Sequence, residues 1–600
     1  MALRGINLPL AWVGQEKILV DVFHEIGLTD AEIASFLSGP AFQAWNRFGN
    51  IQGSWHGNLP RVWIDDQFDL QKKIIRRMVE LGMTPVLPSF TGFLPSNFTR
   101  VFPNASVIRG AQWGGFPLRY TNDTFLQPFD EHFAQLQKSF ISKQRDAYGD
   151  VSHVYTLDQY NEIDPSSGDP DYLRNISRGT WRAFKEADPG AIWMMQGWLF
   201  FASSDFWTNE RIEAYLSGVE KDSDMLILDL WSDSIPLWRQ TNSYFGKPWI
   251  WCHLHNFGGN MGLYGQVMNL TVNASQARFE SPSMVGFGHT MEGQEGNEIV
   301  YDLLLDQAWS STPLDTKRYF QRWVNSRYTG SGSIPKELLQ AWDVLRRTVY
   351  SSTNPVYPAV PKGILELQPG IWGLDLLMYG HGTNITYDPA EVVMAWQLMY
   401  KAAQTEGSLW SNPAYQHDMV DVTRQVMANA FVSLYSDLVA TYNSSGTADK
   451  LSQQGKKMDG LLSALDAVLS TNKNFRLSTW ISAARAWAHG NQSYASYLEY
   501  QARNQITLWG PNGEITDYAS KQWGGLVASY YAPRWRLFVE YLKMTPVSSY
   551  NATALNAKLR QFELSWQERE LNETEPTKEV SLEKVVDRVR RDWTSMFGDP

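Results

Sequence analysis

Two acidic residues stand at the predicted ends of buried strands, where their carboxyl groups could act on a sugar. Glu162 lies in Tyr160-Asn161-Glu162-Ile163-Asp164-Pro165, directly after an apolar run. Glu292 lies in His289-Thr290-Met291-Glu292-Gly293, after another apolar run further along the chain. Hydrolysis of a glycosidic bond needs one carboxyl group that protonates the leaving oxygen and a second that acts as nucleophile or activates water. Glu162 and Glu292 are therefore the candidate catalytic pair.

The residues around Glu162 favour the role of proton donor. Asp158 and Asp164 flank it, and nearby negative charge helps to keep a carboxylic acid protonated. Asn161 is placed to donate a hydrogen bond to the 2-substituent of a sugar. The alternative is that Asn161 and Glu162 only cap a turn before Pro165.

Other residues near Glu292 compete with it or support it. Glu295 and Glu298 are the competing carboxylates, but Glu298 is predicted in the first turn of the next helix, where a carboxylate complements the helix dipole. Tyr301, one helical turn beyond Asn297, could donate its hydroxyl to the nucleophile. The alternative for Tyr301 is an aromatic side chain packed at the start of the helix.

The sequence gives little support for a metal or a cofactor. His253 and His255 alternate along one predicted strand, but no third ligand stands near them, and a pair alone is weak support for a metal site. We expect a single hydrogen-bonding His255 at the mouth of the barrel, and no metal. No Gly-x-Gly-x-x-Gly, P-loop or Gly-x-Ser-x-Gly pattern occurs in a suitable setting, so no nucleotide cofactor is expected.

The first 325 residues repeat an apolar run, a polar loop and an amphipathic stretch, the pattern of parallel strands joined by helices. Seven strands are expected, at Ile6–Trp12, Thr84–Phe90, His153–Tyr160, Ala191–Trp198, Asp224–Trp231, Pro248–His255 and Ser283–Thr290. An eight-stranded (β/α)8 TIM barrel needs one more. Since Met1 to Gly5 resemble the last turn of a helix, we expect the first strand upstream of this chain. An open sheet of seven strands is the alternative.

The pattern changes after about residue 330, and an α-helical bundle is expected there. Apolar residues recur at three- and four-residue intervals, for example at Met458, Leu461, Leu462 and Leu465. The predicted architecture is therefore α/β followed by all-α, with a barrel domain at 1–325 and a helical domain at 326–600.

Composition narrows the class of partner. The net charge is −11 and no basic cluster occurs, which argues against binding to nucleic acid or to a membrane surface, because both are anionic. The chain contains 26 tryptophans, and Trp198, Trp231 and Trp251 stand at or near predicted strand ends, where an indole ring can stack on a sugar. The alternative is that these tryptophans belong to the core.

Cysteine and asparagine patterns point to different compartments. Cys252 is the only cysteine, so no intramolecular disulfide forms, which by itself favours a reducing compartment. Glycosylation sequons favour the secretory pathway, with a vacuole or the outside as endpoint; they occur at Asn97, Asn104, Asn122, Asn175, Asn269, Asn273, Asn384, Asn443, Asn491, Asn551 and Asn572. The first residues lack the features of a signal peptide.

Longer motifs resemble a known family. The chain resembles the alpha-N-acetylglucosaminidases of glycoside hydrolase family 89, lysosomal enzymes that trim terminal N-acetylglucosamine from heparan sulfate, and is similar to fungal-type members. The segments that carry the resemblance are Gly5-Ile6-Asn7-Leu8, Gly39-Pro40-Ala41-Phe42, Gly82-Met83-Thr84-Pro85-Val86-Leu87-Pro88, Gln196-Gly197-Trp198-Leu199-Phe200, Leu254-His255-Asn256-Phe257-Gly258-Gly259-Asn260 and Leu508-Trp509-Gly510-Pro511.

The resemblance implies a role for each site residue. It makes Glu162 the acid/base and Glu292 the nucleophile of a retaining double displacement, in which the two carboxyl groups lie about 5–5.5 Å apart. It implies an exo-acting enzyme without a cofactor and a homo-oligomer. Side chains expected around the sugar are Trp45, Trp113, Trp198, Tyr301 and His255, with Trp509 and Tyr518 reaching the pocket from the helical half.

The chain departs from the family at its start. Family members carry a small N-terminal domain and a first barrel strand that contacts N-acetylglucosamine, and this sequence begins at a point that matches the middle of their first helix. Two alternatives to the glycosidase therefore stay open. One is a catalytically impaired, sugar-binding homologue, and the other is a different family on the same barrel that accepts another sugar.

Overall fold

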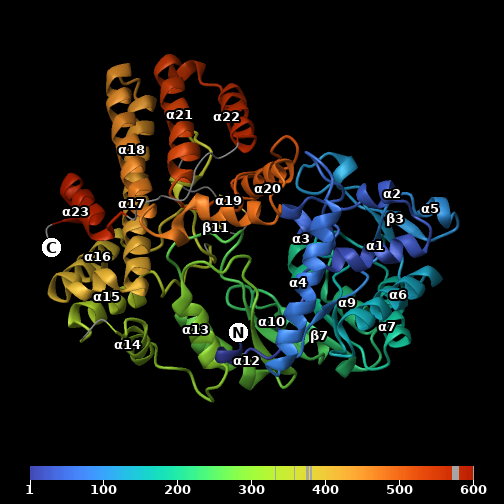
Figure 1. Ribbon diagram of the computed structural model, residues 1–600. Coiled ribbons are helices and arrows are strands. Elements are labelled where there is room, and N and C mark those ends of the chain that lie inside the picture. The colour runs from blue at the N-terminus through green and yellow to red at the C-terminus, as the bar shows by residue number, and fades with distance from the viewer. Residues whose placement is uncertain (331–332, 357, 373–376, 379–380, 570–579, 599–600) are drawn as a thin grey trace. The chain divides into compact units, whose positions relative to one another are not determined.

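The computed structural model describes residues 1–330, 333–356, 358–372, 377–378, 381–569 and 580–598. The chain forms two compact units (Figure 1). The first contains Met1–His253 and Asn273–Thr290, and the second contains Leu254–Val272 and Met291–Pro600.

The first unit contains a parallel sheet of six strands that neighbour one another in chain order. The order is β1-β5-β6-β7-β8-β9, and each described neighbouring pair is parallel. The strands are β1 Leu87–Pro88, β5 Val154–Thr156, β6 Ile192–Gln196, β7 Met225–Asp229, β8 Trp249–His253 and β9 Met284–His289. Six of the expected apolar runs therefore contain a strand, and this sequential parallel order is the one that builds a TIM-barrel-like domain.

The remaining expected strand, Ile6–Trp12 near the start of the chain, contributes only an isolated parallel bridge between Leu10 and Val86. Backbone bonds continue on both sides of it, because the Val86 N–H donates to the Pro9 carbonyl and the Ala11 N–H to the Val86 carbonyl, both at 2.9 Å. Proline has no N–H to donate, so a regular ladder cannot run through Pro9. The segment lies beside β1 without forming a full strand.

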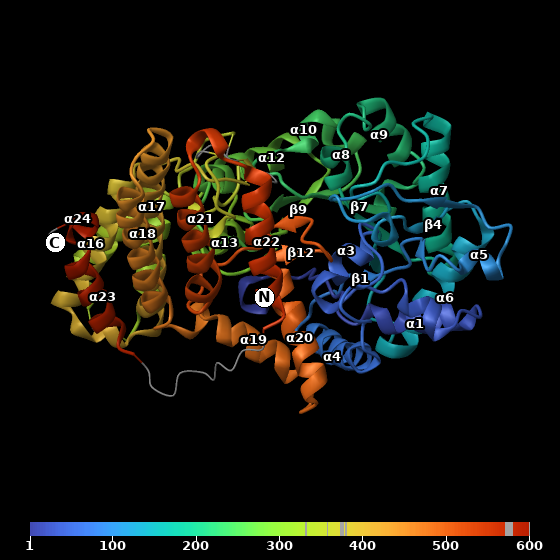
Figure 2. The same cartoon turned by 90° about the horizontal axis from the view of Figure 1, so that it is seen from above.

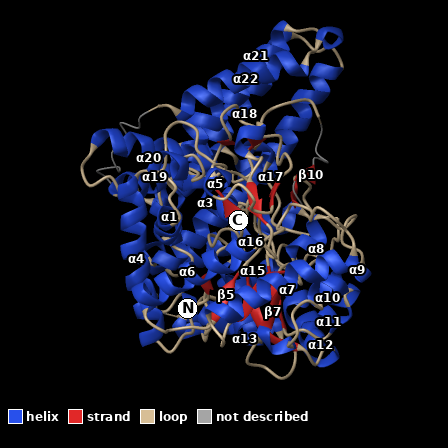
Figure 3. Cartoon of the chain, turned by 90° about the vertical axis from the view of Figure 1, so that its right-hand side faces the viewer, coloured by secondary structure: helices blue, strands red, loops and turns tan. Residues whose placement is uncertain are grey.

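Helices connect the strands and pack on one another in the first unit. α6 packs on α7, α7 packs on α9, and α1 packs on α4 and α6. Figure 3 shows β5 and β7 with α6 and α7 beside them. The longer helices are α1 Gln15–Glu25, α4 Arg61–Glu80, α6 Glu131–Tyr148, α7 Pro170–Ala187, α9 Asn209–Leu216 and α12 Ala274–Glu280. Crossover helices of this kind place all the strands in one direction, so their carboxyl ends share one edge.

A small antiparallel sheet follows β1. It consists of β2 Phe93–Leu94, β4 Thr124–Leu126 and β3 Val107–Arg109, in the order β2-β4-β3. Its core is aromatic, with the rings of Phe93 and Phe125 5.2 Å apart. The loop between β3 and β4 carries Trp113. The small sheet is the base from which that loop extends.

The second unit is mainly helical, as predicted for the C-terminal half. α17 packs on α18 and α18 on α21, and Figure 2 shows these three helices side by side. The longer helices are α13 Glu298–Gln307, α14 Thr316–Arg327, α15 Lys336–Arg347, α16 Pro389–Thr405, α17 Pro413–Asn443, α18 Ala448–Leu469, α19 Leu477–Ala486, α20 Gln492–Gln505, α21 Ala532–Met544, α22 Ala552–Gln567 and α23 Leu582–Asp592. None of the helices in the described ranges is both long and apolar enough to span a membrane.

The helical bundle expected after residue 330 also contains short strands. Two short antiparallel pairs occur, β10 Leu377–Met378 with β11 His381–Gly382, and β12 Leu508–Trp509 with β13 Ile515–Thr516. A two-residue strand is too short to produce a period-2 pattern in the sequence. The β12–β13 hairpin is the element that precedes Tyr518.

Candidate active site

Glu162 lies beyond the end of β5, on the turn that the sequence analysis singled out. Three N–H groups donate to its carboxylate. Asn50 Nδ2 is 2.9 Å and Trp113 Nε1 2.5 Å from Oε2, and Trp198 Nε1 is 3.1 Å from Oε1. All four residues belong to the first unit. A carboxyl group in this setting is fixed in orientation through both of its oxygens.

Different loops of the first unit supply the three donors. Asn50 is buried and follows the short helix α3 Gln43–Arg47, and its backbone N–H donates to the Trp45 carbonyl at 2.9 Å. Trp113 comes from the loop between β3 and β4, and Trp198 is the first residue of α8 Trp198–Ala202. Three segments of the first unit therefore converge on Glu162. They lie after the bridge at Leu10, between β3 and β4, and after β6. Loops at the carboxyl edge of a parallel barrel converge in this way.

The two aspartates that flank Glu162 in the sequence behave differently from each other. Burial raises the pKa of Asp158 to about 7, and its Oδ1 accepts the Gln196 N–H at 2.7 Å. Asp164 is exposed. Asp158 is thus largely protonated below pH 7 and gives little of the negative charge that the sequence interpretation assigned to it. Asn161 is half-buried, and among the described residues it is not one of the donors to Glu162.

Glu292 comes three residues after the last residue of β9 and belongs to the second unit. Two donors meet on its Oε2: the Gly258 backbone N–H at 2.5 Å and the Tyr518 hydroxyl at 2.7 Å. Neither donor carries a charge, and both stabilise the ionised carboxylate. This arrangement suits a group that acts as an anion, such as a nucleophile.

Close backbone packing brings those two donors together. Gly258 has φ of 61°, and a Cβ at this position would lie 2.7 Å from both the Ala519 Cα and the Tyr518 carbonyl oxygen. Only glycine allows this approach without a clash. The Asn256 side chain joins the same group, since its Nδ2 donates to the Gly293 carbonyl at 2.9 Å. The glycine-containing motif at 254–260 thus holds the turn that carries Glu292.

A buried lysine lies close to this turn. The Lys521 ammonium donates to the Gly258 carbonyl and, at 3.1 Å, to the Ala519 carbonyl. Burial lowers the pKa of Lys521 to about 8, while the nearby carboxylates Glu295, Glu366 and Glu292 act in the opposite direction. Lys521 therefore keeps its positive charge at neutral pH, and this charge attracts the carboxylate of Glu292.

The remaining aromatic candidates lie in different environments. Trp45 is half-buried in α3, with its ring 6.2 Å from that of Phe42. Trp509 is buried in β12, and its ring lies 4.7 Å from that of Tyr518. Trp509 therefore supports Tyr518 from behind. Trp251, expected near a strand end, is a buried residue within β8 and belongs to the core.

Tyr301 and His255 pack together in the second unit. The Asn256 Nδ2 donates to the Tyr301 hydroxyl at 3.0 Å, and the His255 and Tyr301 rings are 5.1 Å apart, edge to face. His255 is buried with φ of 67°, in the left-handed region that non-glycine residues seldom adopt. His253 belongs to the first unit, where its ring lies 5.5 Å from that of His289. The hydroxyl that the structure shows on Glu292 is that of Tyr518.

One cluster in the described ranges has the composition of a metal site. Glu298, His417 and Asp418 hold ligand atoms within 4.8 Å of one another. Arg327 already occupies it, because its Nε and Nη2 donate to the two carboxylate oxygens of Asp418, each at 2.6 Å. Glu298 is also the first residue of α13, as predicted. A guanidinium in this position makes the cluster an ion-pair network.

Sequence reasoning missed several residues of these two sites. Asn50, Gly258 and Lys521 stand far in sequence from the glutamates that they serve, and none lies in a local pattern that marks a catalytic group. Of these three, only Gly258 belongs to a segment, 254–260, on which the family resemblance rests. The contact of a backbone N–H is set by φ and by packing, neither of which residue type reveals.

Comparisons with known proteins agree on one family. A family model described as "Alpha-N-acetylglucosaminidase (NAGLU) tim-barrel domain" matches residues 1–311, and one described as "Alpha-N-acetylglucosaminidase (NAGLU) C-terminal domain" matches residues 319–590. The human alpha-N-acetylglucosaminidase is 38% identical over 544 residues, which cover 90% of this chain and 71% of the human protein.

Solved structures give the same result. A family 89 glycoside hydrolase from Clostridium perfringens, in complex with 2-acetamido-1,2-dideoxynojirmycin, matches with a TM-score of 0.87 at 27% identity and covers 98% of this chain. A variant of the Clostridium perfringens protein with two glutamates changed to glutamine, in complex with its substrate GlcNAc-alpha-1,4-galactose, matches with a TM-score of 0.88 at 27% identity and covers 99% of this chain. The chain spans 65% and 66% of those two chains.

Proposed function

Because the chain belongs to the alpha-N-acetylglucosaminidases of glycoside hydrolase family 89, we propose that it is an exo-acting glycosidase that removes terminal alpha-linked N-acetylglucosamine from glycans. The proposal rests above all on the two glutamates and their separate sets of donors. Glu162 is held by three N–H groups in one unit, and Glu292 by an N–H and a hydroxyl in the other. A glycosidase needs two oriented carboxyl groups of this kind.

We propose a retaining double displacement. In the first step a carboxylate oxygen of Glu292 attacks the anomeric carbon while Glu162 gives its proton to the glycosidic oxygen, and the bond to the leaving group breaks. The product of this step is a beta-linked ester of the sugar with Glu292. In the second step Glu162 removes a proton from water, the water oxygen attacks the anomeric carbon, and the ester bond breaks. The sugar leaves as the alpha anomer.

The neighbours of each glutamate fit their proposed roles. Tyr518 and the Gly258 N–H stabilise the anion of Glu292 before attack, and the ammonium of Lys521 adds a positive charge nearby. Trp113 and Trp198 present half-buried indole rings beside Glu162, surfaces on which a sugar ring can stack. Trp45, His255, Tyr301 and Trp509 are proposed to complete the sugar pocket, with Asn161 directed at the 2-acetamido group.

We further propose that residues 1–325 form the catalytic domain and that residues 326–600 form a domain that contributes to the site. The hydrogen bond from Tyr518 to Glu292 supports this proposal, because Tyr518 comes from the C-terminal half of the sequence. Replacing Trp509, whose ring packs on Tyr518, should therefore lower turnover although it lies more than 200 residues from either glutamate.

Product stereochemistry tests the reaction. Proton NMR during hydrolysis of an aryl alpha-N-acetylglucosaminide should show the alpha anomer of N-acetylglucosamine first, with the beta anomer growing later by mutarotation. The beta-linked aryl glycoside and an aryl alpha-glucoside should remain intact. If the beta anomer appears first, the reaction inverts and the double displacement is wrong. Calorimetric binding of N-acetylglucosamine without any turnover would instead indicate a sugar-binding homologue.

We propose that the protein enters the secretory pathway as a glycoprotein. The sequon asparagines Asn104, Asn175, Asn443 and Asn491 are exposed, as an oligosaccharide acceptor must be, whereas Asn572 lies outside the described residues. Expression in a eukaryotic secretory host, followed by treatment with a peptide N-glycosidase, should lower the intact mass. An unchanged mass would argue against the proposal.

We also propose a homo-oligomer. Large apolar side chains are exposed in both units, for example Phe279 in the first at 91% and Trp309 in the second at 76%. Only a contiguous apolar patch marks a protein interface, so the proposal follows chiefly from the family resemblance. Light scattering coupled to size-exclusion chromatography should give a mass that is a multiple of 68.5 kDa before glycans are counted.

A further inference from the structure

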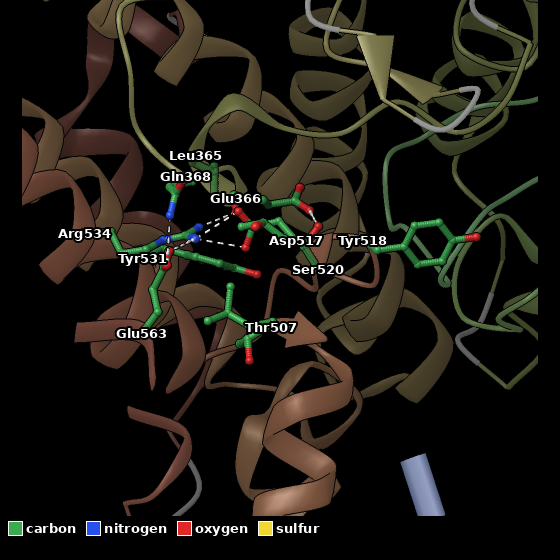
Figure 4. A network of polar contacts seen from close by, with 12 residues as sticks. Leu365, Glu366, Gln368, Thr507, Asp517, Tyr518, Ser520, Tyr531, Arg534 and Glu563 are labelled. Atoms are coloured by element: carbon green, nitrogen blue, oxygen red, sulfur yellow. Dashed lines mark hydrogen bonds and ion pairs between the residues drawn. The ribbon is translucent and has the colours of Figure 1, made fainter. Parts of the chain in front are cut away.

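Six charged side chains are buried together behind Tyr518 in the second unit. We call them the buried charge network: Lys362, Lys521, Arg534, Asp517, Glu366 and Glu563. Figure 4 labels the last four of these. Three are basic and three acidic. Removing charges from water is costly, and well-packed apolar residues of similar size often give equal or greater stability. Folding stability alone is therefore a weak explanation for why these charges are buried. Their position next to Tyr518 suggests a role in the site.

The ammonium of Lys362 is bound to the segment that carries Tyr518. It donates to the carbonyl of Asp517, to the carbonyl of Tyr518 at 2.8 Å and to the hydroxyl of Ser520 at 3.1 Å. An ammonium has three N–H groups, and all three are used on this one segment. Burial lowers the pKa of Lys362 to about 8, so at neutral pH it still carries the proton that makes the third bond possible.

Arg534 fixes the residue just before Tyr518. Its Nη1 lies 2.9 Å from each carboxylate oxygen of Asp517 and 2.9 Å from Glu563 Oε1. Asp517 has φ of 55°, in the left-handed region, where an L-residue with a side chain is under strain. The guanidinium compensates for that strain with charge-assisted bonds. Because Asp517 precedes Tyr518, its backbone angles set the direction in which the Tyr518 side chain leaves the hairpin.

The rest of the segment is tied down in the same way. The Ser520 hydroxyl donates to Glu366 Oε2 at 2.7 Å, and the Gln522 amide donates to Glu366 Oε1 at 2.5 Å. The Tyr531 hydroxyl donates to the Lys521 carbonyl at 2.9 Å. Residues 517–522 are therefore held by buried polar groups. In Figure 4 the Tyr518 side chain points away from the labelled charged residues, and its hydroxyl donates to Glu292.

We propose that Lys362 and Arg534 are positioning residues for the reaction, which hold the backbone at Asp517 and Tyr518 so that the Tyr518 hydroxyl stays on Glu292. Neither side chain touches the sugar in this proposal. They act through Tyr518, and Tyr518 acts on the anion of Glu292. The inference rests on the proposed role of Glu292 as nucleophile.

A double-mutant cycle tests the proposal. Lys362→Met keeps most of the length of the side chain and removes all three donors, and Tyr518→Phe removes only the hydroxyl. Each single change should lower kcat/KM for an aryl alpha-N-acetylglucosaminide by about 10- to 100-fold, with the loss in kcat. The double variant should be no worse than the poorer single variant, because both changes break one chain of contacts. Effects that multiply would overturn the proposal.

A matched variant separates positioning from general loss of stability. Arg327→Met removes a half-buried cation of the same unit, one that pairs with Asp418. It should lower the melting temperature as Lys362→Met does, yet its effect on kcat should be small and should multiply with that of Tyr518→Phe. If Arg327→Met lowers kcat as much as Lys362→Met, stability explains the result and the proposal fails. Should Lys362→Met not fold, Ser520→Ala breaks the same network more gently, and the same cycle applies.

Hydrogen exchange gives a readout that does not depend on turnover. In Lys362→Met, peptides that cover 507–522 should exchange faster than in the wild type, and peptides from α17 and α18 should not change. Unchanged exchange at 507–522 would overturn the positioning role. An inert wild-type protein would refute the proposed function by itself, and the exchange measurement would still decide whether Lys362 holds the segment.

Discussion

Glu162 and Glu292 are held by surroundings of different kinds. Around Glu162 the donors are neutral side chains, Asn50, Trp113 and Trp198, and each comes from a different loop of the first unit. Around Glu292 the donors are a backbone N–H and a phenol, and behind the phenol lies the buried charge network of the second unit. Glu162 is held by side chains from several segments of the first unit. Glu292 is held by segments that buried charged residues fix in turn.

The difference fits what each group must do in the proposed reaction. An acid/base group gains and loses a proton in every turnover, and the donors described for Glu162 include no cationic side chain. A nucleophile must remain an anion, and the ammonium of Lys521 favours the anion as long as it keeps its proton. The buried charge of Lys521 thus lies near Glu292, which must stay ionised until it attacks. It is not among the donors described for Glu162, which must change its protonation state.

Removing the proposed nucleophile should have the largest effect. Glu292→Ala should lower kcat by about 10⁴-fold or more, because no ester with the enzyme can form. Azide should restore turnover of an activated aryl substrate by attacking from the side that Glu292 occupied, giving the beta-glycosyl azide. Glu295→Ala, which changes the competing carboxylate of the same loop, should remain active. An alpha-glycosyl azide from Glu292→Ala would reverse the two assignments.

Removing the proposed acid/base should cost less and should depend on the leaving group. Glu162→Ala is expected to lower kcat/KM by about 10²- to 10⁴-fold for substrates with a poor leaving group. A dinitrophenyl glycoside, whose leaving group needs no proton, should lose much less. Azide should here give the alpha-glycosyl azide, because it attacks the ester from the side that Glu162 serves. Asp164→Ala, an exposed neighbour, is the matched control.

Removing one donor from each glutamate compares the two surroundings directly. Asn50→Ala takes one of three donors from Glu162, and we expect kcat/KM to fall by about tenfold or less, since Trp113 and Trp198 still hold both oxygens. Tyr518→Phe takes one of the two donors to Glu292 described above and should cost more. Asn46→Ala is the matched control for Asn50, because Asn46 is also buried but bonds to the Phe36 carbonyl. A larger loss for Asn50→Ala than for Tyr518→Phe would contradict the comparison.

Local patterns were enough to find the sheet and to single out Glu162 and Glu292 as candidates. Six apolar runs contain the strands, and because parallel strands end at one edge, a carboxylate just after such a run was a sound candidate. Two of the predictions from local patterns failed. Pro9 turned an expected strand into a single bridge, and Trp251 proved to be a core residue although it stands near a strand end.

The partners of the glutamates were beyond local reasoning. Asn50 stands 112 residues from Glu162, and Tyr518 stands 226 residues from Glu292. Tyr518 was expected only through the family resemblance, and Lys362 and Arg534 by no route. In a sequence a buried lysine or arginine cannot be told from an exposed one, because most lysines and arginines lie on the surface. Only tertiary packing shows which of them face inwards.

The smallest expected effect concerns pH and separates the two surroundings most cleanly. Lys521 has a pKa of about 8, lowered chiefly by burial, so its positive charge beside Glu292 is present at pH 7 and about nine-tenths lost at pH 9. We therefore expect kcat/KM to fall by at most about tenfold between these values. Lys521→Met should remove this alkaline limb. Lys543→Met, which changes a half-buried lysine in the last turn of α21, should leave it unchanged.

Stability should move in the opposite direction, which excludes unfolding as the cause. The pKa of Lys521 is lower in the folded chain than its ordinary 10.5, so between about pH 8 and 10.5 the unfolded chain binds more protons. Folding stability of the wild type relative to Lys521→Met should therefore rise with pH across that range while activity falls. Parallel melting curves and rate profiles of the two proteins measure both quantities. A relative stability that falls with pH would show that Lys521 is not the buried, charge-bearing group behind Glu292, and the contrast with Glu162 would then lose its electrostatic basis.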